Sequence, residues 1–475
     1  MDDSIRAAVN VVPSERQINW QRTEFYGFIH FGINTFTDRE WGTGKEDPKL
    51  FNPTELDADQ WVRTFKAAGM RGLILTCKHH DGFCLWPSKY TDYSVAASDW
   101  RGGKGDLVRE VSDACRRGGI KFGIYLSPWD RHERTYGDSE AYNRFYLAQL
   151  KELLTSYGEI FSVWLDGACG EGPDGRKQVY DWDAYHRLVR ELQPGAVISV
   201  CGPDVRWCGN EAGHCRESEW SVVPAVLRKA ELTQEKSQKV DDGTFARRIN
   251  TEDADLGSRE AIRGVKELAW YPAEVNTSIR PGWFYHPAED DQVRTVDELL
   301  KIYYGSVGGN ACLLLNVPPD RRGLIHERDA AVLEELGRVI RDTFAENLAD
   351  NAKAWASDTL DFNHRVENIL DGNPDTYWRP SEGNETCSIE IDLVRPVVFD
   401  RVVLCEHIRS GQRIESFSVD YWTDDGWVEC YRGTVVGYKR ICCFERVKAQ
   451  RLRIRITGSR YYPTLSEVGV YLERR

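Results

Sequence analysis

The stretch IFSVWLDGAC, residues 160–169, decides how the rest of the chain is interpreted. Five of its first six residues are apolar and the other, Ser162, is small, which is typical of a strand buried on both faces. Asp166 then follows Trp164 and Leu165 directly. A carboxylate beside large buried side chains is costly to desolvate, so its presence there requires a reason. The stretch therefore predicts a buried parallel strand that ends on a chemically important carboxylate.

The segments on both sides of this stretch alternate between strand and helix patterns. Apolar runs typical of buried strands occupy residues 25–36, 73–77, 120–129, 196–202, 270–279 and 311–319. Helical patterns occupy residues 59–68, 106–119, 139–158, 181–195, 296–307 and 327–346. Such alternation predicts parallel strand–helix units, and about eight strands in roughly 340 residues fit a (β/α)8, TIM-like barrel. The polar region 220–267 interrupts the pattern and predicts loops or an insertion.

The pattern changes after residue 347. Short segments rich in Val, Ile, Tyr and Trp follow one another closely, separated by turn sequences such as DGNPD and TDDGW. Examples are SIEIDL (388–393), SFSVDYW, GWVECYR and RLRIRIT. Close spacing of short strands predicts an antiparallel β-sandwich. We therefore expect two domains, an α/β barrel over residues 1–348 and a β-sandwich over residues 349–475.

Composition excludes several classes of function. The net charge of −13 argues against binding to nucleic acid or to an anionic membrane surface. The sequence contains no run of about eighteen apolar residues, so no membrane span is predicted. It also shows no basic segment followed by an apolar one, so no signal peptide is predicted. Thirteen cysteines, an odd number scattered from Cys77 to Cys443, indicate reduced thiols. These features together predict a cytoplasmic protein.

The three evenly spaced cysteines Cys201, Cys208 and Cys215 raise the question of a metal site. Structural zinc sites favour cysteine pairs separated by two to four residues, and this spacing is wider. Local packing is therefore the favoured interpretation.

Polar side chains gather where the predicted strands end, which is where parallel barrels build their active sites. They are His30, the pair His79 and His80, Tyr125, Asp166, and Asp204, Trp207 and Glu211 in the segment 202–213. Histidines, carboxylates and aromatic residues suit the hydroxyl groups and apolar faces of a sugar ring. The sequence has no glycine-rich loop of the kind that binds phosphate.

Each of these residues also has a structural interpretation. A single His30 could be a hydrogen-bonded core histidine, and Asp166 could cap a following helix. The next predicted helix begins only at residue 181, which weakens the capping interpretation. Adjacent His79 and His80 cannot both point into one core, because neighbouring side chains on a strand alternate. Joint ligation of a metal by adjacent histidines is awkward, so no metal is predicted at this site.

Several motifs resemble a known family. In this order, HFGINTF, the EW of REWGTG, KHHDGF, GIYLS and VWLDG are similar to glycoside hydrolase family 29, the α-L-fucosidases. NEAG, SEWS (218–221) and RPGWFYH (280–286) resemble its subfamily specific for α-1,3/1,4-linked fucose. In the C-terminal region, ILDGNPDTYW (369–378) and LSEVGVYL resemble a discoidin-type, family 32 carbohydrate-binding module.

The family resemblance implies roles for individual residues. Asp166 matches the catalytic nucleophile and Glu211 the subfamily's general acid/base, with Glu217 and Glu219 as nearby rivals. Trp283 matches an apolar wall near the fucose methyl group. The remaining matches to the lining of the fucose pocket are His30, Glu40, Trp41, His79, His80, Tyr125 and Trp164.

The implied activity is retaining exo-hydrolysis of terminal α-1,3/1,4-linked L-fucose from Lewis-type oligosaccharides and glycoconjugates. A relaxed fucosidase, another exo-glycosidase and a non-catalytic sugar-binding protein remain alternatives. The implied partner is a fucosylated oligosaccharide, and no cofactor is required for the reaction. The DGNPD turn (371–375) offers oxygen ligands for a calcium ion in the β-sandwich.

Overall fold

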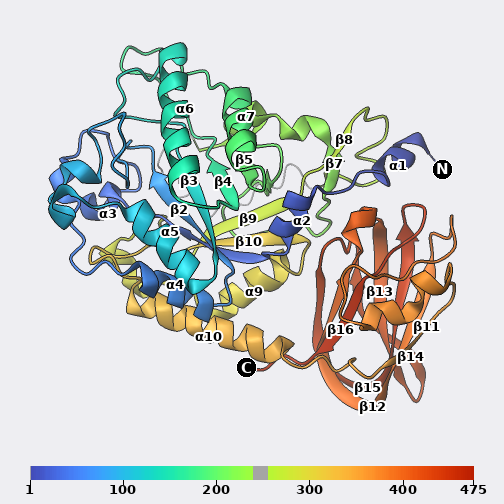
Figure 1. Ribbon diagram of the computed structural model, residues 1–475. Helices are drawn as coiled ribbons and strands as arrows, with labels where there is room; N and C mark the ends of the chain where they lie inside the picture. Colours follow the sequence, from blue (N-terminus) through green and yellow to red (C-terminus); the bar gives the residue numbers. More distant parts are fainter. Residues whose placement is uncertain (1, 239–254) are drawn as a thin grey trace.

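The computed structural model describes residues 2–238 and 255–475. A barrel of parallel strands surrounded by helices is followed by a domain of antiparallel strands (Figure 1). The predicted fold class, a TIM-like α/β barrel followed by an antiparallel β-sandwich, is confirmed as a nearly closed parallel barrel followed by a domain of antiparallel strands. The predicted loop region 220–267 is described only in part, because residues 239–254 lie outside the described residues.

The barrel sheet has eight strands in the order β5-β4-β3-β2-β1-β10-β9-β6. All neighbouring strands are parallel, so their carboxyl ends meet at one end of the barrel. A bridge between Ser199 and Val205 joins the two edges and nearly closes the barrel. The strands are β1 (Phe25–Ile29), β2 (Gly72–Lys78), β3 (Lys121–Leu126), β4 (Ser162–Leu165), β5 (Val197–Val200), β6 (Arg206–Trp207), β9 (Ala273–Ser278) and β10 (Ala311–Asn316).

Two barrel segments differ from the sequence prediction. The predicted strand over residues 25–36 ends at Ile29, and helix α3 (Ile33–Thr37) follows. The chain leaves the sheet here because Phe31 packs edge-to-face on Trp61 of a neighbouring helix. Strand β6 has only two residues and lies in the segment 202–213, for which the sequence predicts no strand. A strand that short has no periodicity from which to predict it.

The barrel helices begin where the sequence supplies capping side chains. In α4 to α7 an aspartate just before the helix accepts a backbone N–H from its first turn. Thr295 and Glu298 form a capping box at the start of α9. The helices are α1 (Asp3–Ala8), α2 (Glu15–Gln21), α4 (Ala58–Ala67), α5 (Leu107–Gly118), α6 (Ser139–Ser156), α7 (Trp182–Leu192), α8 (Ala230–Lys236), α9 (Val296–Ser306) and α10 (Glu327–Phe344).

The C-terminal domain is one antiparallel sheet that folds back on itself. Two long strands carry register shifts in their shared ladder, after Asp392 and after Phe399. The first half of β12 pairs with β11 and its second half with β16, and apolar residues from both halves share one core. The strands are β11 (Lys353–Ala356), β12 (Cys387–Cys405), β13 (Ile414–Thr423), β14 (Gly426–Gly433), β15 (Arg440–Ser459) and β16 (Glu467–Tyr471).

The two domains are joined by the segment between α10 and β11, in which the predicted boundary at residues 348 and 349 falls. They are also in direct contact, since Val403 and Ile441 of the sheet domain belong to the apolar cluster of the barrel. A small hairpin-like sheet of β7 (Val222–Pro224) and β8 (Leu268–Trp270) extends from the barrel beside α1 (Figure 1). Within the described residues, no helix combines the length and apolar character that a membrane crossing requires.

Candidate active site

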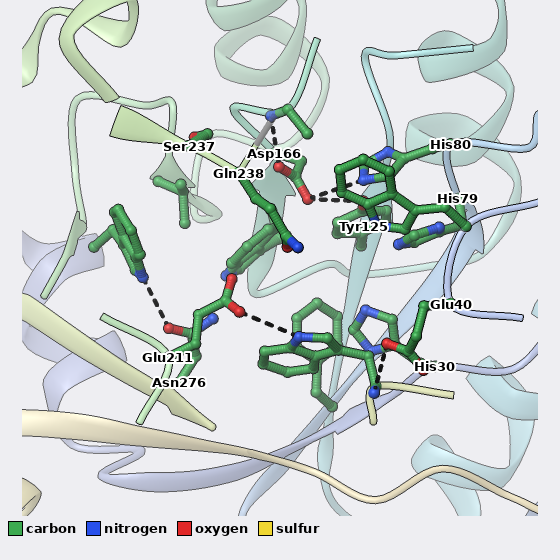
Figure 2. A pocket seen from close by; sticks show the side chains of 17 residues that line it. His30, Glu40, His79, His80, Tyr125, Asp166, Glu211, Ser237, Gln238 and Asn276 are labelled. Carbon is green, nitrogen blue, oxygen red and sulfur yellow. Dashed lines mark hydrogen bonds and ion pairs between the residues drawn. The ribbon is translucent and has the colours of Figure 1, made fainter. Parts of the chain in front are cut away.

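A pocket opens at the carboxyl ends of the barrel strands (Figure 2). Its walls come from strand ends, from the segment after β6 and from the turn that follows β9. The structure brings to this pocket all ten residues that the family resemblance assigned to catalysis or sugar binding, namely His30, Glu40, Trp41, His79, His80, Tyr125, Trp164, Asp166, Glu211 and Trp283. Trp207 also lines the pocket, whereas Asp204 lies outside it, buried and paired with Arg190.

Asp166 is the first residue after β4 and keeps 22% of its side chain exposed to the pocket. Its Oδ2 accepts a hydrogen bond from the Tyr125 hydroxyl at 2.9 Å. Its Oδ1 accepts one from the backbone N–H of Ala168 at 2.8 Å. Helix α7 begins at Trp182 and is capped by Asp181, so Asp166 is not a helix cap. Both oxygens of Asp166 therefore act as hydrogen-bond acceptors.

His80 presents a hydrogen-bond acceptor to the pocket. Its Nδ1 lies 2.7 Å from the hydroxyl of Ser127, and that hydroxyl donates to the carbonyl of Trp129 at 2.7 Å. Because Ser127 has only one proton to donate, Nδ1 of His80 must be the donor in their pair. Burial lowers the pKa of His80 to about 4, so the ring is neutral. Nε2, at 3.9 Å from Oδ2 of Asp166, therefore carries a free lone pair.

His30 and His79 are also neutral. Burial lowers the pKa of His30 to about 3 and that of His79 well below its ordinary value. Nδ1 of His30 lies 2.8 Å from Oδ1 of Asn316, which makes Nδ1 the donor. Nδ1 of His79 is buried and has no hydrogen-bond partner within the described residues. Neutral imidazoles can bind hydroxyl groups without adding charge to the pocket.

Glu211 lies on the segment that follows β6 and enters the same pocket as Asp166 (Figure 2). Its Oε2 accepts a hydrogen bond from the indole N–H of Trp283 at 3.2 Å. Burial, and then the negative charge of Asp166, raise the pKa of Glu211 to about 8, while the Trp283 hydrogen bond acts in the opposite direction. Glu211 is therefore protonated at neutral pH.

The two rival carboxylates lie outside this pocket. Glu217 is exposed, and its backbone carbonyl accepts bonds from the sheet domain. Glu219 is fully buried and forms ion pairs with Arg206 and Arg216. A carboxylate held between two arginines is a poor proton donor, because both cations favour its ionised form.

Glu40 does not point freely into the pocket but holds the turn that carries Trp283. Its Oε2 accepts the backbone N–H of Trp283 at 2.9 Å, and its Oε1 accepts that of Phe284 at 3.0 Å. Nε2 of His286 also lies 2.7 Å from Oε1, and its Nδ1 lies 2.8 Å from Asp38. Burial opposes the charge on His286, but the bonds to Glu40 and Asp38 outweigh it and raise the pKa of His286 to about 9.

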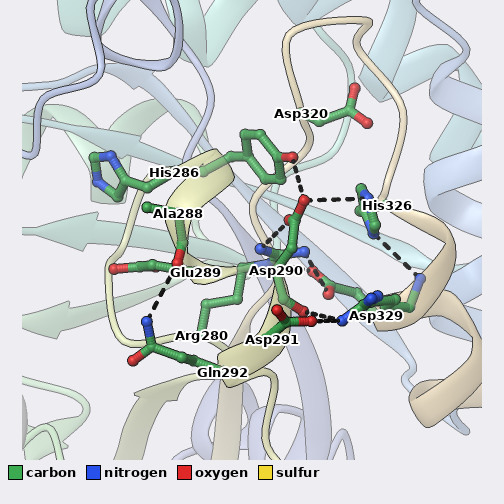
Figure 3. Close-up of polar contacts among 12 residues, drawn as sticks. Arg280, His286, Ala288, Glu289, Asp290, Asp291, Gln292, Asp320, His326 and Asp329 are labelled. Carbon is green, nitrogen blue, oxygen red and sulfur yellow. Dashed lines mark hydrogen bonds and ion pairs between the residues drawn. The ribbon is translucent and has the colours of Figure 1, made fainter.

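A second network anchors the other side of the same turn (Figure 3). The buried guanidinium of Arg280 binds both carboxylate oxygens of Asp329, at 2.8 and 2.9 Å, and Asp290 at 2.8 Å. Glu289 accepts the backbone N–H of Gly282 at 3.0 Å. The turn is thus tied to α10 and to the short 3-10 helix over residues 287–292, which makes Trp283 a rigid part of the pocket wall.

The Trp164 indole is turned away from the pocket centre. Its N–H donates to Oε1 of Glu274 at 2.7 Å, so this nitrogen is not available to a ligand. Glu274 is buried inside the barrel, which raises its pKa to about 7, and its other oxygen accepts the Tyr26 hydroxyl. Trp164 stacks on Tyr125 at 5.4 Å, so this buried carboxyl supports the aromatic floor beside Asp166.

Sequence reasoning missed three polar residues of the pocket. Asn276 of β9 accepts the indole N–H of Trp207 at 3.0 Å, and Ser237 and Gln238 follow α8. Asn276 could have been found as an amide in the middle of a buried strand. Ser237 and Gln238 lie in the irregular polar region, where no pattern distinguishes them.

Within residues 2–238 and 255–475, no group of three or more His, Cys, Asp or Glu side chains is arranged to hold a metal ion. All thirteen cysteines fall in these ranges and are free thiols. Cys201, Cys208 and Cys215 contact different backbone carbonyls, those of Ala230, Asn210 and Gly309 among them.

Comparisons with known proteins agree with this geometry. The model of the α-L-fucosidase family matches residues 9–343, and that of the F5/8 type C domain matches residues 353–468. Alpha-L-fucosidase 1 of Arabidopsis thaliana is 43% identical over 470 residues, which cover 98% of this chain and 88% of the plant protein.

Two crystal structures are similar along almost the whole chain. A Bacteroides ovatus protein shares 46% identity with a TM-score of 0.86, covering 99% of this chain and 76% of that one. A Ruminococcus gnavus GH29 fucosidase, solved in complex with fucose, shares 33% identity with a TM-score of 0.83, covering 98% and 95% of the two chains. The chain belongs to the α-L-fucosidase family, glycoside hydrolase family 29, and is an α-L-fucosidase with a C-terminal F5/8 type C domain.

Proposed function

We propose that Asp166 is the nucleophile and Glu211 the general acid/base of retaining fucoside hydrolysis. The supporting observation is the contrast between two carboxyl groups in one pocket. Asp166 accepts hydrogen bonds on both oxygens, whereas burial raises the pKa of Glu211 to about 8. A retaining glycosidase needs this pair of states, one carboxylate to attack and one carboxylic acid to donate a proton.

The reaction then proceeds in two displacements. An oxygen of Asp166 attacks the anomeric carbon of terminal fucose as the bond to the leaving oxygen breaks, and Glu211 gives that oxygen its proton. This produces a fucosyl ester of Asp166 and a free alcohol. The Glu211 carboxylate then takes a proton from water, and the water oxygen attacks the anomeric carbon and releases Asp166. Two inversions leave the configuration retained.

The remaining pocket residues hold the sugar. The free lone pair on Nε2 of His80 accepts a hydrogen bond from a ring hydroxyl, and neutral His30 and His79 bind other hydroxyls. Trp283 supplies an apolar wall for the methyl-bearing face of fucose. Glu40 contributes by fixing the backbone of Trp283 through its two hydrogen bonds to the turn.

Two substitutions test the catalytic assignment. Asp166→Asn removes the nucleophile and is expected to abolish hydrolysis of every fucoside. Glu211→Gln is expected to retain kcat/KM on an aryl fucoside with a good leaving group, to lose activity on an oligosaccharide, and to recover turnover with azide. Azide can attack the fucosyl ester without a general base. Wild-type behaviour of Glu211→Gln on the oligosaccharide would refute the assignment.

We propose α-1,3/1,4-linked fucose of Lewis-type glycans as the substrate. The support is the resemblance of NEAG, SEWS and RPGWFYH to that subfamily, together with the pocket position of Glu211 and Trp283 from two of these motifs. The test compares kcat/KM on Lewis trisaccharides, an α-1,2-fucosylated trisaccharide and a simple aryl fucoside. Hydrolysis of the aryl fucoside much faster than of the Lewis trisaccharides would favour the alternative of a relaxed fucosidase.

We further propose that the sheet domain binds calcium at the 371–375 turn. The supporting groups are the carboxylate of Asp371, the hydroxyl of Thr376 bonded to it at 2.7 Å, and Glu467. Oε1 of Glu467 is buried without a hydrogen-bond partner among the described residues. Burial, with a contribution from the charge of Asp371, raises the pKa of Glu467 to about 7, and a bound cation would favour its ionised form.

Oxygen ligands of this kind suit calcium. Asp375 of the same turn pairs with Arg22 and Arg409 and is not counted among the ligands. Calcium is expected to raise the Tm of the wild type and to leave that of Glu467→Gln nearly unchanged. An equal response of both proteins, or of neither, would contradict the site.

A further inference from the structure

The loop that carries Glu211 is closed at its base by buried ionic contacts. Glu219 is fully buried, with one oxygen paired to Arg206 of β6 and the other 3.4 Å from Arg216. Arg216 also donates to the carbonyl of Cys208 at 2.8 Å, across the two ends of the loop. The position of Glu211 therefore depends on where the chain at residues 217–221 is held.

The sheet domain holds this part of the chain. Gln412, which is fully buried just before β13, donates to the carbonyl of Glu219 at 3.3 Å and accepts the backbone N–H of Ser221 at 2.7 Å. One side chain thus binds the backbone on both sides of Trp220. The ring of Trp220 lies under the guanidinium of Arg460, 3.8 Å from its centre.

A second set of contacts comes from Thr434, which follows β14, and from Arg440, the first residue of β15. Arg440 donates to the carbonyl of Glu217 at 3.0 Å. Thr434 also donates to that carbonyl, at 3.2 Å, and accepts the hydroxyl proton of Ser218 at 2.9 Å. The barrel also binds this segment, since Asn310 donates to the carbonyl of Glu219 at 2.8 Å and the backbone of Tyr271 donates to that of Ser221. The buried N–H of Ser221 has Gln412 as its partner, and leaving such a group unpaired costs more than the bond itself contributes.

We propose that the sheet domain is a structural part of the catalytic centre, with Gln412, Thr434 and Arg440 acting as positioning residues for the Glu211 loop. This proposal rests on the proposed role of Glu211 as general acid/base. The physical reason is that proton transfer to the leaving oxygen requires Glu211 within hydrogen-bond reach of it. A misplacement of about 1 Å in such a group can cost on the order of a hundredfold in rate.

The proposal predicts a selective defect. Cleavage of an oligosaccharide needs protonation of a poor leaving group, whereas an activated aryl fucoside departs without it. Loosening the loop therefore affects the first substrate and spares the second. A domain that only adds stability produces no such dependence on the leaving group.

The experiment uses the full-length chain with Gln412→Met, which keeps the length of the side chain and removes both hydrogen bonds. We expect kcat/KM on a Lewis trisaccharide to fall about tenfold, the equivalent of one to two hydrogen bonds. On a dinitrophenyl fucoside kcat/KM is expected to change less than about twofold. The loosened loop also admits water to Glu211, so the alkaline limit of the pH profile should move to lower pH.

Gln450→Met is the matched control. Gln450 lies in β15 of the same domain and donates to Asp392 at 3.0 Å, a contact within the sheet. Both kcat/KM values of this variant are expected to match the wild type. If Gln412→Met does not fold, Thr434→Val, an isosteric change at a half-buried position, tests the same proposal. We expect it to show the same selective loss of kcat/KM on the Lewis trisaccharide, of smaller size.

An equal fall on both substrates, or no fall on either, would overturn the proposal. Glu211→Gln measured in parallel separates the two hypotheses. If Glu211→Gln shows no dependence on the leaving group, the acid/base assignment itself fails. If Glu211→Gln shows the dependence on the leaving group and neither Gln412→Met nor Thr434→Val does, only the positioning role of the sheet domain is wrong.

Discussion

Replacing Trp283 with phenylalanine removes a hydrogen bond from Glu211 and leaves an aromatic wall in place. The indole N–H donates to Oε2 of Glu211 at 3.2 Å and favours the ionised carboxylate, so it holds the pKa of Glu211 below the value that burial and Asp166 alone would produce. Its loss should raise that pKa. Because the protonated acid is the active form, the alkaline limit of kcat/KM should move to higher pH.

The size of the shift follows from the strength of one hydrogen bond. A net contribution of about 0.5–1.5 kcal/mol, at 1.36 kcal/mol per pKa unit, corresponds to roughly 0.4–1.1 pH units. The starting point is the wild-type limit near the Glu211 pKa of about 8. The limit in Trp283→Phe is therefore expected between about pH 8.4 and 9.1.

The assay is the pH dependence of kcat/KM on an oligosaccharide substrate between pH 5 and 10. Trp207→Phe is the matched control, because the Trp207 indole lines the same pocket but donates to Asn276. Its alkaline limit should stay at the wild-type position even if its KM changes. An unchanged limit in Trp283→Phe, or a shift to lower pH, would refute the electrostatic account of Glu211.

The other predictions concern stability. The pKa of Glu211 in the folded protein is about 8, above its ordinary 4.5, so the folded state loses stability from this group as the pH rises through that interval. Calorimetry should therefore show that the Tm of Glu211→Gln, relative to the Tm of the wild type, increases from pH 5 to pH 8. A Tm difference that stays constant with pH would contradict this. Arg280→Met leaves buried Asp329 without its cation and should lower the free energy of unfolding by about 3–5 kcal/mol in urea, against less than about 1 kcal/mol for exposed Arg328→Met. Gly337→Ala should destabilise α10, because a Cβ there would meet the carbonyl oxygen of Ala67 at 1.8 Å, whereas Gly305→Ala in α9 meets no atom within 4 Å and should stabilise by about 0.5–1 kcal/mol. Stabilisation by Gly337→Ala as well, in a urea titration, would show that helix propensity outweighs packing there.

Local patterns in the sequence were enough for the barrel and for most of its site. The alternation of apolar strands and capped helices depends on neighbours within a few residues, and the structure follows it from β1 to α10. A residue just after a parallel strand must lie at the carboxyl end of the barrel, so His30, His79 and Asp166 could be assigned to one pocket. Strand β6 was not predicted, because two residues are too few to show a periodic pattern.

The environment of each carboxyl group, by contrast, could not be predicted from local patterns in the sequence. Glu211, Glu217 and Glu219 lie within nine residues and have the same intrinsic acidity. Only the folded chain separates them, by placing Glu211 beside Trp283 in the pocket and Glu219 between Arg206 and Arg216.

The same division holds for the whole molecule. The sequence alone determined which elements form and that Asp166 ends a buried strand, because these depend on local periodicity and capping. Tertiary structure alone decided that Glu211 is protonated, that His286 fixes Glu40, and that Gln412 binds the chain 193 residues earlier. Charge states and long-range contacts arise from groups far apart in the chain, which meet only once the barrel closes and the sheet domain packs against it.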